Sequence, residues 1–403
     1  MADSSTERRF TTPLYDDDAL AAARQAPSMP PLDLLEARLA RLRAAMAASS
    51  PAIEALMVMG AENKGWLSGF TTGAFLAPGG VIVVTAEQST FVTSHVDYEE
   101  CQQALTHMRV VPYESETEEL ADRVVAVIAA LGVSRIWIEA PHTSVAEATR
   151  YARMLQTRSI TLEHGPSVIA PLRATKDVWE AEQLRLANAA TARAFAEVLP
   201  LLRPGITEWE IAAELDYRLR REGHGSARNA FQSIVASGPN SAFPHASVSQ
   251  RALEHGDFLT FDFGATWNGY CADCTRTVVI GSASERQRAL YAAVLASQEA
   301  SIAAIHTDGA CDAIDAVART SLFEAGYGDF IAHSLGHGLG VEVHEAPRLA
   351  PRSSERLLPG SIVTVEPGLY IPGFGGVRIE DNILIHADGI ENLTTTPKAL
   401  LEL

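Results

Sequence analysis

Two aspartates lie on a predicted β-hairpin in the second half of this sequence of 403 residues. Apolar alternation over residues 259–277, on both sides of Asn268-Gly269, predicts two antiparallel strands joined by a two-residue type I′ turn. With that turn, Asp262 and Asp273 become diagonal neighbours on one face, about 7 Å apart at the backbone. Two carboxylates on an otherwise apolar hairpin are costly unless a cation offsets their charge. The hairpin therefore predicts a metal site rather than a solvated face.

Further carboxylates and histidines follow the hairpin in the sequence. His333, His337 and His344 stand among glycines and small residues in AHSLGHGLGVEVHE, Glu366 stands in TVEPG, and Glu380 stands in GGVRIED. Four carboxylates and one imidazole can hold two divalent ions a few ångströms apart. Such a pair bridges a water molecule, lowers its pKa and polarises a carbonyl. This chemistry is that of hydrolysis.

An internal repeat connects these residues. Glu366 lies 104 residues after Asp262, and Gly368 lies 104 residues after Gly264. The pattern of helix, helix, strand and strand is expected in the same order in each half. Because a pseudo-twofold domain places equivalent positions face to face, Asp262 and Glu366 are expected to approach each other.

The length of the chain and its 47% hydrophobic content predict two domains. Short apolar strands alternate with amphipathic helices in the first part, which indicates an α/β domain. A capping box at Thr207 and Glu210 starts one of the helices expected in the second part. The expected segments are a loosely held polar arm, the α/β domain, a linker, and the domain with the acids: residues 1–30, 31–166, 167–174 and 175–403.

Charge and composition exclude several classes of partner. A formal net charge of −18 argues against nucleic acid and against anionic membranes. The N-terminus lacks the apolar core of a secretory signal, and no run reaches membrane-spanning length, so a cytoplasmic location is expected. Four cysteines are too few and too scattered for a disulfide framework, and Cys271 and Cys274 are expected to be buried thiols.

The motifs DFGATWNGYCADCTRT, HSLGHGLGVEVHE, VEPGLYIP and GGVRIED, in this order, resemble those of the prolidase, aminopeptidase P and methionine aminopeptidase family. The resemblance covers about residues 175–400. It implies an α+β catalytic domain of the pita-bread fold with an internal pseudo-twofold repeat, preceded by an α/β creatinase-like N-terminal domain. Methionine aminopeptidases generally lack that first domain. Within the family the sequence is most similar to bacterial Xaa-Pro dipeptidases.

The resemblance implies a role for each metal ligand. Asp262 and Asp273 would bind one metal ion, and Asp273 and Glu380 would bridge the pair. Glu366 would also be the general base for a bridging hydroxide that attacks the peptide carbonyl. The pair would be manganese, cobalt, zinc or iron, with manganese favoured. The metal ligands implied are Asp262, Asp273, His337, Glu366 and Glu380.

Three further residues are implied at the substrate. His344 matches the histidine that stabilises the tetrahedral intermediate, and His245 matches one that lines the substrate pocket. Arg348 matches the arginine that clamps the free carboxylate of a dipeptide. Each has an alternative reading, because the histidines could be structural and the arginine could be a surface residue. His333 and Arg378 are expected to support the ligands, with Arg378 holding Glu380 or Asp381.

The expected activity is two-metal hydrolysis of Xaa-Pro dipeptides by a homodimer. The first alternative is an Xaa-Pro aminopeptidase that acts on longer peptides, and the second is a non-peptidase C–N hydrolase of the same fold. A catalytically dead binding module would lack at least one ligand, whereas this sequence has them all. Some relatives carry a tyrosine where this sequence has Phe231, which excludes a mechanism that uses that hydroxyl.

Overall fold

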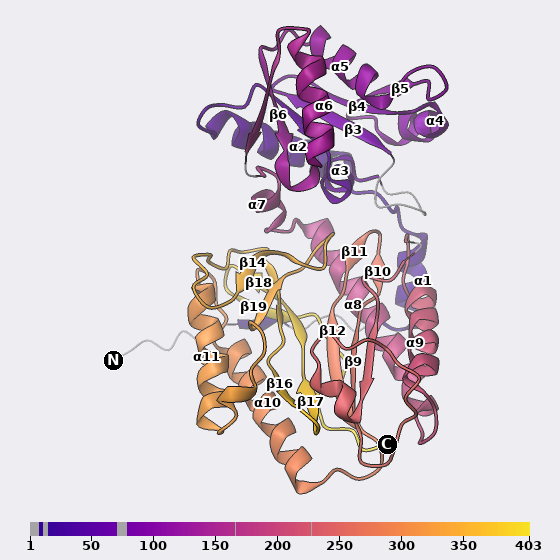
Figure 1. Cartoon of the computed structure of the whole chain (residues 1–403), viewed down its shortest axis with the longest axis vertical. Coiled ribbons are helices and arrows are strands. Elements are labelled where there is room, and N and C mark those ends of the chain that lie inside the picture. Colours follow the sequence, from indigo (N-terminus) through magenta and orange to yellow (C-terminus); the bar gives the residue numbers. More distant parts are fainter. Residues whose placement is uncertain (1–7, 11–14, 71–78, 166, 227) are drawn as a thin grey trace. The chain divides into compact units, whose positions relative to one another are not determined.

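The computed structural model describes residues 8–10, 15–70, 79–165, 167–226 and 228–403 (Figure 1). The chain divides into two compact units, Pro27–Arg173 and a second unit made of Met1–Ala26 and Ala174–Leu403. The later boundary falls inside the segment 167–174 that the sequence indicates as a linker. None of the described helices has the length and the hydropathy needed to cross a membrane.

The first unit is an α/β domain built on one mixed sheet. Its strands follow the order β5 (Arg109–Tyr113), β4 (Ser89–Ser94), β3 (Gly80–Thr85), β2 (Ala55–Val58), β6 (Arg135–Glu139) and β7 (Thr161–Gly165). The helices are α2 (Leu32–Ala48), α3 (Ala61–Ser68), α4 (His95–Ala104), α5 (Leu120–Ala130), α6 (Val145–Gln156) and α7 (Ala170–Arg173). Apolar residues of α5, α6 and the central strands form its core. The alternation of short strands and helices that the sequence predicts for this part of the chain is confirmed, whereas α7 lies in the segment predicted as a linker.

The N-terminal residues differ from the loosely held arm expected over 1–30. β1 (Arg8–Phe10) pairs in parallel with β19 (Gly389–Asn392). α1 (Asp17–Gln25) is capped by Asp16, and its Leu20 is fully buried in the core of the second unit. One N-cap, one buried leucine and backbone pairing with a distant strand therefore fix a segment whose composition is polar. The expectation of a loose arm was wrong for the described residues.

The second unit repeats one set of elements, as predicted. The first half contains α8 (Val178–Val198), α9 (Glu208–Glu222), β9 (Phe258–Phe263) and β12 (Cys274–Val279). The second half contains α10 (Glu285–Ala303), α11 (Cys311–Glu324), β15 (Ile362–Val365) and β18 (Asp381–His386) in the same order. β9 pairs with β12, and β15 pairs with β18, both antiparallel. α9 begins with the capping box of Thr207 and Glu210 that the sequence predicts.

The strands of the second unit form several sheets (Figure 1). β8 (Ile234–Ser237) lies beside β9 in the order β12-β9-β8. β15 and β18 lie in a larger sheet with the order β1-β19-β18-β15-β13-β14, where β13 is Gly336–Gly338 and β14 is Glu345–Leu349. Short ladders join β10 (Thr266–Trp267) to β11 (Tyr270–Cys271), and β16 (Gly368–Ile371) to β17 (Gly375–Arg378).

The predicted hairpin and its turn are confirmed. Trp267 pairs with Tyr270 across the turn, and Asp262 pairs with Thr275 along the strands. Asn268 has φ +47° and Gly269 has φ +85°, the left-handed values that a type I′ turn requires at both positions. All four cysteines are buried and free, which confirms the burial expected of Cys271 and Cys274.

Arg276 of β12 joins the two halves of the second unit. Its guanidinium donates to Asp381 Oδ1 at 2.8 Å, to the Glu380 carbonyl at 2.6 Å and to the Thr396 carbonyl at 2.6 Å. Arg276 and Asp381 are both almost fully buried. A buried ion pair whose remaining donors reach carbonyl oxygens is costly to break from one side, because the partners then lose their hydrogen bonds.

Arg276→Met is therefore expected to lower the free energy of unfolding by about 3–5 kcal/mol, because Asp381 and the carbonyl oxygens lose their buried donor. The measurement is urea unfolding of the metal-free protein, followed by tryptophan fluorescence. Arg288→Met is the matched control, since Arg288 pairs with Glu402 at the surface and its loss should leave the midpoint unchanged. Equal midpoints for both variants would contradict this account.

Candidate metal centre

Eight residues selected from the sequence line a single cavity of about 430 Å³ in the second unit. Asp262 lies on β9, Asp273 directly precedes β12, and His337 lies on β13. Glu366 follows β15, and Glu380 lies between β17 and β18. The hairpin, the glycine-rich segment and the last strands thus meet at one point. His245, His344 and Arg348 line the same cavity.

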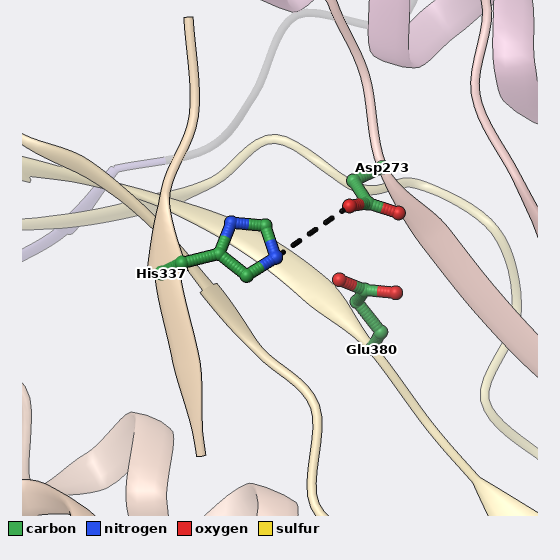
Figure 2. A group of neighbouring side chains, drawn as sticks. All are labelled: Asp273, His337 and Glu380. Carbon is green, nitrogen blue, oxygen red and sulfur yellow. Dashed lines mark ion pairs between the residues drawn. The ribbon is translucent and has the colours of Figure 1, made fainter. Parts of the chain in front are cut away.

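Asp273, His337 and Glu380 form the tightest group (Figure 2). All three are buried, and one ligand atom of each lies within 4.8 Å of the others. His337 Nε2 is 3.7 Å from Asp273 Oδ2 and 3.2 Å from Glu366 Oε1. Asp262 and Glu366 line the same cavity as this group.

Burial of like charges controls the protonation of these acids. Burial, with Glu380 and Asp262 nearby, raises the pKa of Asp273 well above its usual range. Burial and the charge of Glu366 raise the pKa of Glu380 in the same way. Burial also opposes ionisation of Glu366, but the hydrogen bond from His337 lowers its pKa to about 2. Without a cation, protons on Asp273 and Glu380 therefore relieve the repulsion.

The free oxygen atoms of the cluster fit a divalent metal ion. Asp262 Oδ1 and Glu380 Oε1 are buried and have no hydrogen-bond partner among the described residues. The second oxygen of Asp262 accepts from Arg378, and the second oxygen of Glu380 accepts from Thr275. Buried acceptors without donors are rare in proteins, and carboxylate oxygens with one imidazole suit several divalent metals.

Arg378 organises the groups behind the acids. Its Nη2 donates to Asp262 Oδ2 at 2.7 Å, and its Nε donates to Thr275 Oγ1 at 2.9 Å. Thr275 Oγ1 in turn donates to Glu380 Oε2 at 2.8 Å. Arg378 was expected to hold Glu380 or Asp381. It binds Asp262 directly and reaches Glu380 only through Thr275.

Tyr370 extends this network and links it to the supporting histidine. Its hydroxyl lies 2.7 Å from Arg378 Nη1 and 2.8 Å from His333 Nε2. His333 thus reaches Arg378 through Tyr370 and also lines the cavity. Its supporting role stays a prediction. The sequence reasoning did not select Thr275 or Tyr370, although Thr275 sits in the predicted register opposite Asp262.

Glycines allow the backbone to pack closely around His337. A Cβ atom at Gly336 would lie 2.0 Å from the Thr364 carbonyl oxygen, and one at Gly338 would lie 2.1 Å from the Ala346 carbonyl oxygen. Thr364 Oγ1 accepts from the His337 amide at 3.0 Å and lies 3.1 Å from Glu366 Oε1. The small residues seen in the sequence thus bring His337 beside Glu366.

The other wall of the cavity is suited to an organic ligand. His344 lies with its ring centroid 4.2 Å from that of His337. Within the described chain the Arg348 guanidinium has no carboxylate partner, although it lines the cavity and is exposed. Apolar surface comes from Phe231, Ile234, Pro244 and Val343.

Two family models match this chain. Residues 182–387 match the model of metallopeptidase family M24. Residues 38–175 match the model of the creatinase/prolidase N-terminal domain. Together the two matches span most of both compact units.

Individual proteins of known sequence or structure are similar to this chain over most of its length. The chain is 32% identical over 351 residues to the Xaa-Pro dipeptidase of Pyrococcus horikoshii, covering 87% of this chain and 95% of that protein. The structure of an Xaa-Pro dipeptidase from Bacillus anthracis superposes with a TM-score of 0.85 at 32% identity, covering 92% of this chain and all of that one. The structure of an X-Pro aminopeptidase from Thermotoga maritima superposes with a TM-score of 0.79 at 33% identity. The match covers 87% of this chain and 98% of that one. These likenesses confirm a creatinase-like N-terminal domain and a pita-bread domain.

Metal binding is expected to release protons and to weaken as the pH falls. The pKa values of Asp273 and Glu380 are raised, so a larger fraction of each is protonated at pH 6 than at pH 8, and a cation must displace those protons. For each proton displaced, affinity for Mn²⁺ should fall about tenfold per pH unit.

The affinity for Mn²⁺ and the number of protons released are measured by calorimetric titration of metal-free protein with Mn²⁺. The titration is made at pH 6, 7 and 8 in buffers of different ionisation enthalpy. Glu214→Gln is the control, because this glutamate is exposed and pairs with Arg218 on its own helix, away from the cavity residues. An affinity for Mn²⁺ that does not change with pH would rule out protonated acids in the empty cluster.

Proposed function

Since the chain belongs to metallopeptidase family M24, we propose that it is a metal-dependent Xaa-Pro dipeptidase. The observation that carries this proposal is the pairing, in one cavity, of an acid and imidazole cluster with an arginine that has no carboxylate partner in the described chain. The cluster supplies hydrolytic chemistry, and the arginine supplies a site for the free carboxylate of a short peptide. The names of the similar proteins support the same substrate class.

Five residues would hold two metal ions. Asp273 and Glu380 would be the ligands that the two ions share. Two divalent ions, when bound, would supply activation of a water molecule and polarisation of the peptide carbonyl. The donor set suits manganese, cobalt, iron and zinc, and we favour manganese. The proposed ligands are Asp262, Asp273, His337, Glu366 and Glu380.

Glu366 is the proposed general base. Burial opposes ionisation of Glu366, but the hydrogen bond from His337 lowers its pKa and keeps the carboxylate ionised. The ionised form would accept a proton from the attacking water and pass it to the leaving proline nitrogen. Burial and the neighbouring His337 lower the pKa of His344, which keeps that ring neutral with one N–H to donate. We propose that His344, whose ring lies 4.2 Å from that of His337, would donate this N–H to the carbonyl oxygen as negative charge develops.

Arg348 and His245 are the proposed substrate contacts. A guanidinium can hold the proline carboxylate through two parallel hydrogen bonds, which fixes the length of the substrate as well as its position. His245 lines the cavity beside Pro244 and the apolar residues. A shaped apolar wall with one cation suits proline, whose ring is apolar and whose carboxylate is free in a dipeptide.

An Xaa-Pro aminopeptidase is the second candidate, favoured by the neighbour of that name from Thermotoga maritima. Such an enzyme must leave space beyond the proline. A non-peptidase hydrolase remains the third reading, with no observation here in its favour. Assembly as a homodimer and a cytoplasmic location stay predictions from the sequence.

Substrate length separates the first two candidates. Metal-free protein reloaded with Mn²⁺ is expected to hydrolyse Ala-Pro and to leave Ala-Pro-Ala largely intact, because the tripeptide has no carboxylate on its proline. Glu366→Ala should abolish both activities and serves as the control. Preferential cleavage of the tripeptide would establish the aminopeptidase instead, and cleavage of neither would point to non-peptide amides.

Arg348→Ala should raise KM for Ala-Pro about 10- to 100-fold while kcat changes less, because a charge-assisted bidentate contact to the ground-state carboxylate is lost. Steady-state kinetics measures both constants. Arg352→Ala is the matched control, since this arginine is exposed, lies four residues further on and does not line the cavity. Equal KM values for wild type and Arg348→Ala would exclude the clamp.

Glu366→Gln tests the proposed base with little change in volume. We expect kcat for Ala-Pro to fall at least about 100-fold, because an amide cannot accept the proton. The metal content must be measured in parallel, since Glu366 is also a proposed ligand. A variant that keeps both the metal ions and the wild-type kcat would remove Glu366 from this role.

A further inference from the structure

We propose that Glu208 is a positioning residue that fixes His245 in the cavity, an inference that rests on the proposed role of His245 in substrate binding. Glu208 is the first residue of α9 and is fully buried. It does not line the cavity. It acts through the segment of residues 237–249, here called the His245 loop, whose two ends both bind its carboxylate.

The first end of the loop binds one carboxylate oxygen. Glu208 Oε1 accepts from the Ser237 amide and from Ser237 Oγ, both at 2.7 Å. The second end binds the other oxygen, since Glu208 Oε2 accepts from the Ser249 amide at 2.9 Å and from Ser249 Oγ at 2.6 Å. Asn240 Nδ2 adds a bond to Oε2 at 2.9 Å. One side chain thus closes a loop of thirteen residues.

The charge of Glu208 is stabilised without a direct ion pair among the described residues. Its donors are backbone amides, two hydroxyls and one amide side chain. The nearby Arg251 pairs with Asp257 and donates to Ser237 Oγ at 2.7 Å. The N-terminal end of α9 also favours a negative charge at this position. An ionised carboxylate is an acceptor at every lone pair, so it can serve both ends of the loop at once.

His245 depends on this loop for its position. The loop leaves β8, forms the 3₁₀ turn Gly238–Ala242, passes His245 and returns to Ser249. The His245 ring is exposed and forms no hydrogen bond within the part of the chain that the structure describes. Because no hydrogen bond from a described residue holds the ring, we infer that the backbone on either side sets its place in the cavity.

The middle of the loop has a second anchor that leaves a role for Glu208. Ser241 Oγ accepts from the Gly376 amide at 2.9 Å, and the Pro244 carbonyl lies 3.4 Å from Arg378 Nη1. These contacts fix the side of the loop nearest the metal centre. Glu208 fixes its two ends, so together they define the direction in which the loop presents His245.

The test is a double-mutant cycle with the Mn²⁺-loaded enzyme and Ala-Pro. Glu208→Gln replaces one acceptor oxygen by an NH₂ group, which cannot bind the donors at one end of the loop. We expect kcat/KM to fall about 10- to 100-fold, since small displacements of a positioned group have effects of this size. Glu210→Gln is the matched control, because Glu210 is exposed on the same helix turn and glutamine also serves in a capping box.

The effect of Glu208→Gln in two other variants shows whether Glu208 positions His245 or stabilises the fold in general. In His245→Ala, the Glu208→Gln substitution should change kcat/KM by less than about twofold, because the group that it positions is already gone. In Arg348→Ala it should keep its full effect. An equal loss in both backgrounds would mean that Glu208 stabilises the fold without acting through His245, and would overturn the proposal.

Hydrogen exchange gives a readout that does not depend on activity. Amides of residues 238–248 should exchange faster in Glu208→Gln than in wild type or Glu210→Gln, and unchanged exchange would overturn the proposal. If Glu208→Gln does not fold, Ser249→Ala takes its place, because it removes only one hydroxyl donor to Glu208. It is combined with His245→Ala and with Arg348→Ala, and the same two results support or overturn the proposal. If the wild-type enzyme cleaves no peptide, the proposed function fails, while the exchange rates still decide whether Glu208 fixes the loop.

Discussion

Mutual repulsion among four carboxylates, two of them buried and two partly buried, is the constraint on which this site depends. Asp262, Asp273, Glu366 and Glu380 line one cavity, and the nearby side chains that can offset their charge include Arg378 and His337. Because the positive charge nearby is smaller than the negative charge of the acids, the pKa values of Asp273 and Glu380 are raised. Protons or cations must make up the difference, because ionised acids cannot share so small a volume unpaired. A folded chain with this cluster is therefore prepared for metal ions.

The internal repeat explains how such a cluster can be assembled. The first half contributes Asp262 and Asp273, and the second half contributes Glu366 and Glu380, so each half brings only two like charges to the interface. Backbone pairing within each half and the buried Arg276 between them oppose the repulsion. Because Arg276 hydrogen-bonds to the Glu380 carbonyl and to the Asp381 carboxylate, it also fixes the backbone next to a ligand.

Local patterns in the sequence were sufficient to predict much of the site. The hairpin register follows from Asn268-Gly269, and the repeat spacing makes Glu366 the equivalent of Asp262. Both acids line the cavity, so these two patterns indicated where they lie. For the described part of residues 1–30, the prediction of a loose arm was wrong because β1 is held by β19, a contact that no local pattern encodes. Glu208 was missed for a related reason, since a glutamate in the first turn of a helix is indistinguishable from ordinary helix capping. The partner of Arg378 was likewise decided by packing across strands that are distant in sequence.

The choice of hydrogen-bond donors behind the acids is itself informative. Arg378 binds one oxygen of Asp262, while Glu380 receives only a neutral hydroxyl from Thr275. A second guanidinium at Glu380 would offset its charge and would lower its pKa, as His337 does for Glu366. It would also compete with a metal ion for the same carboxylate. The neutral donor orients Glu380 without pairing its charge, so a proton or a bound cation must offset that charge.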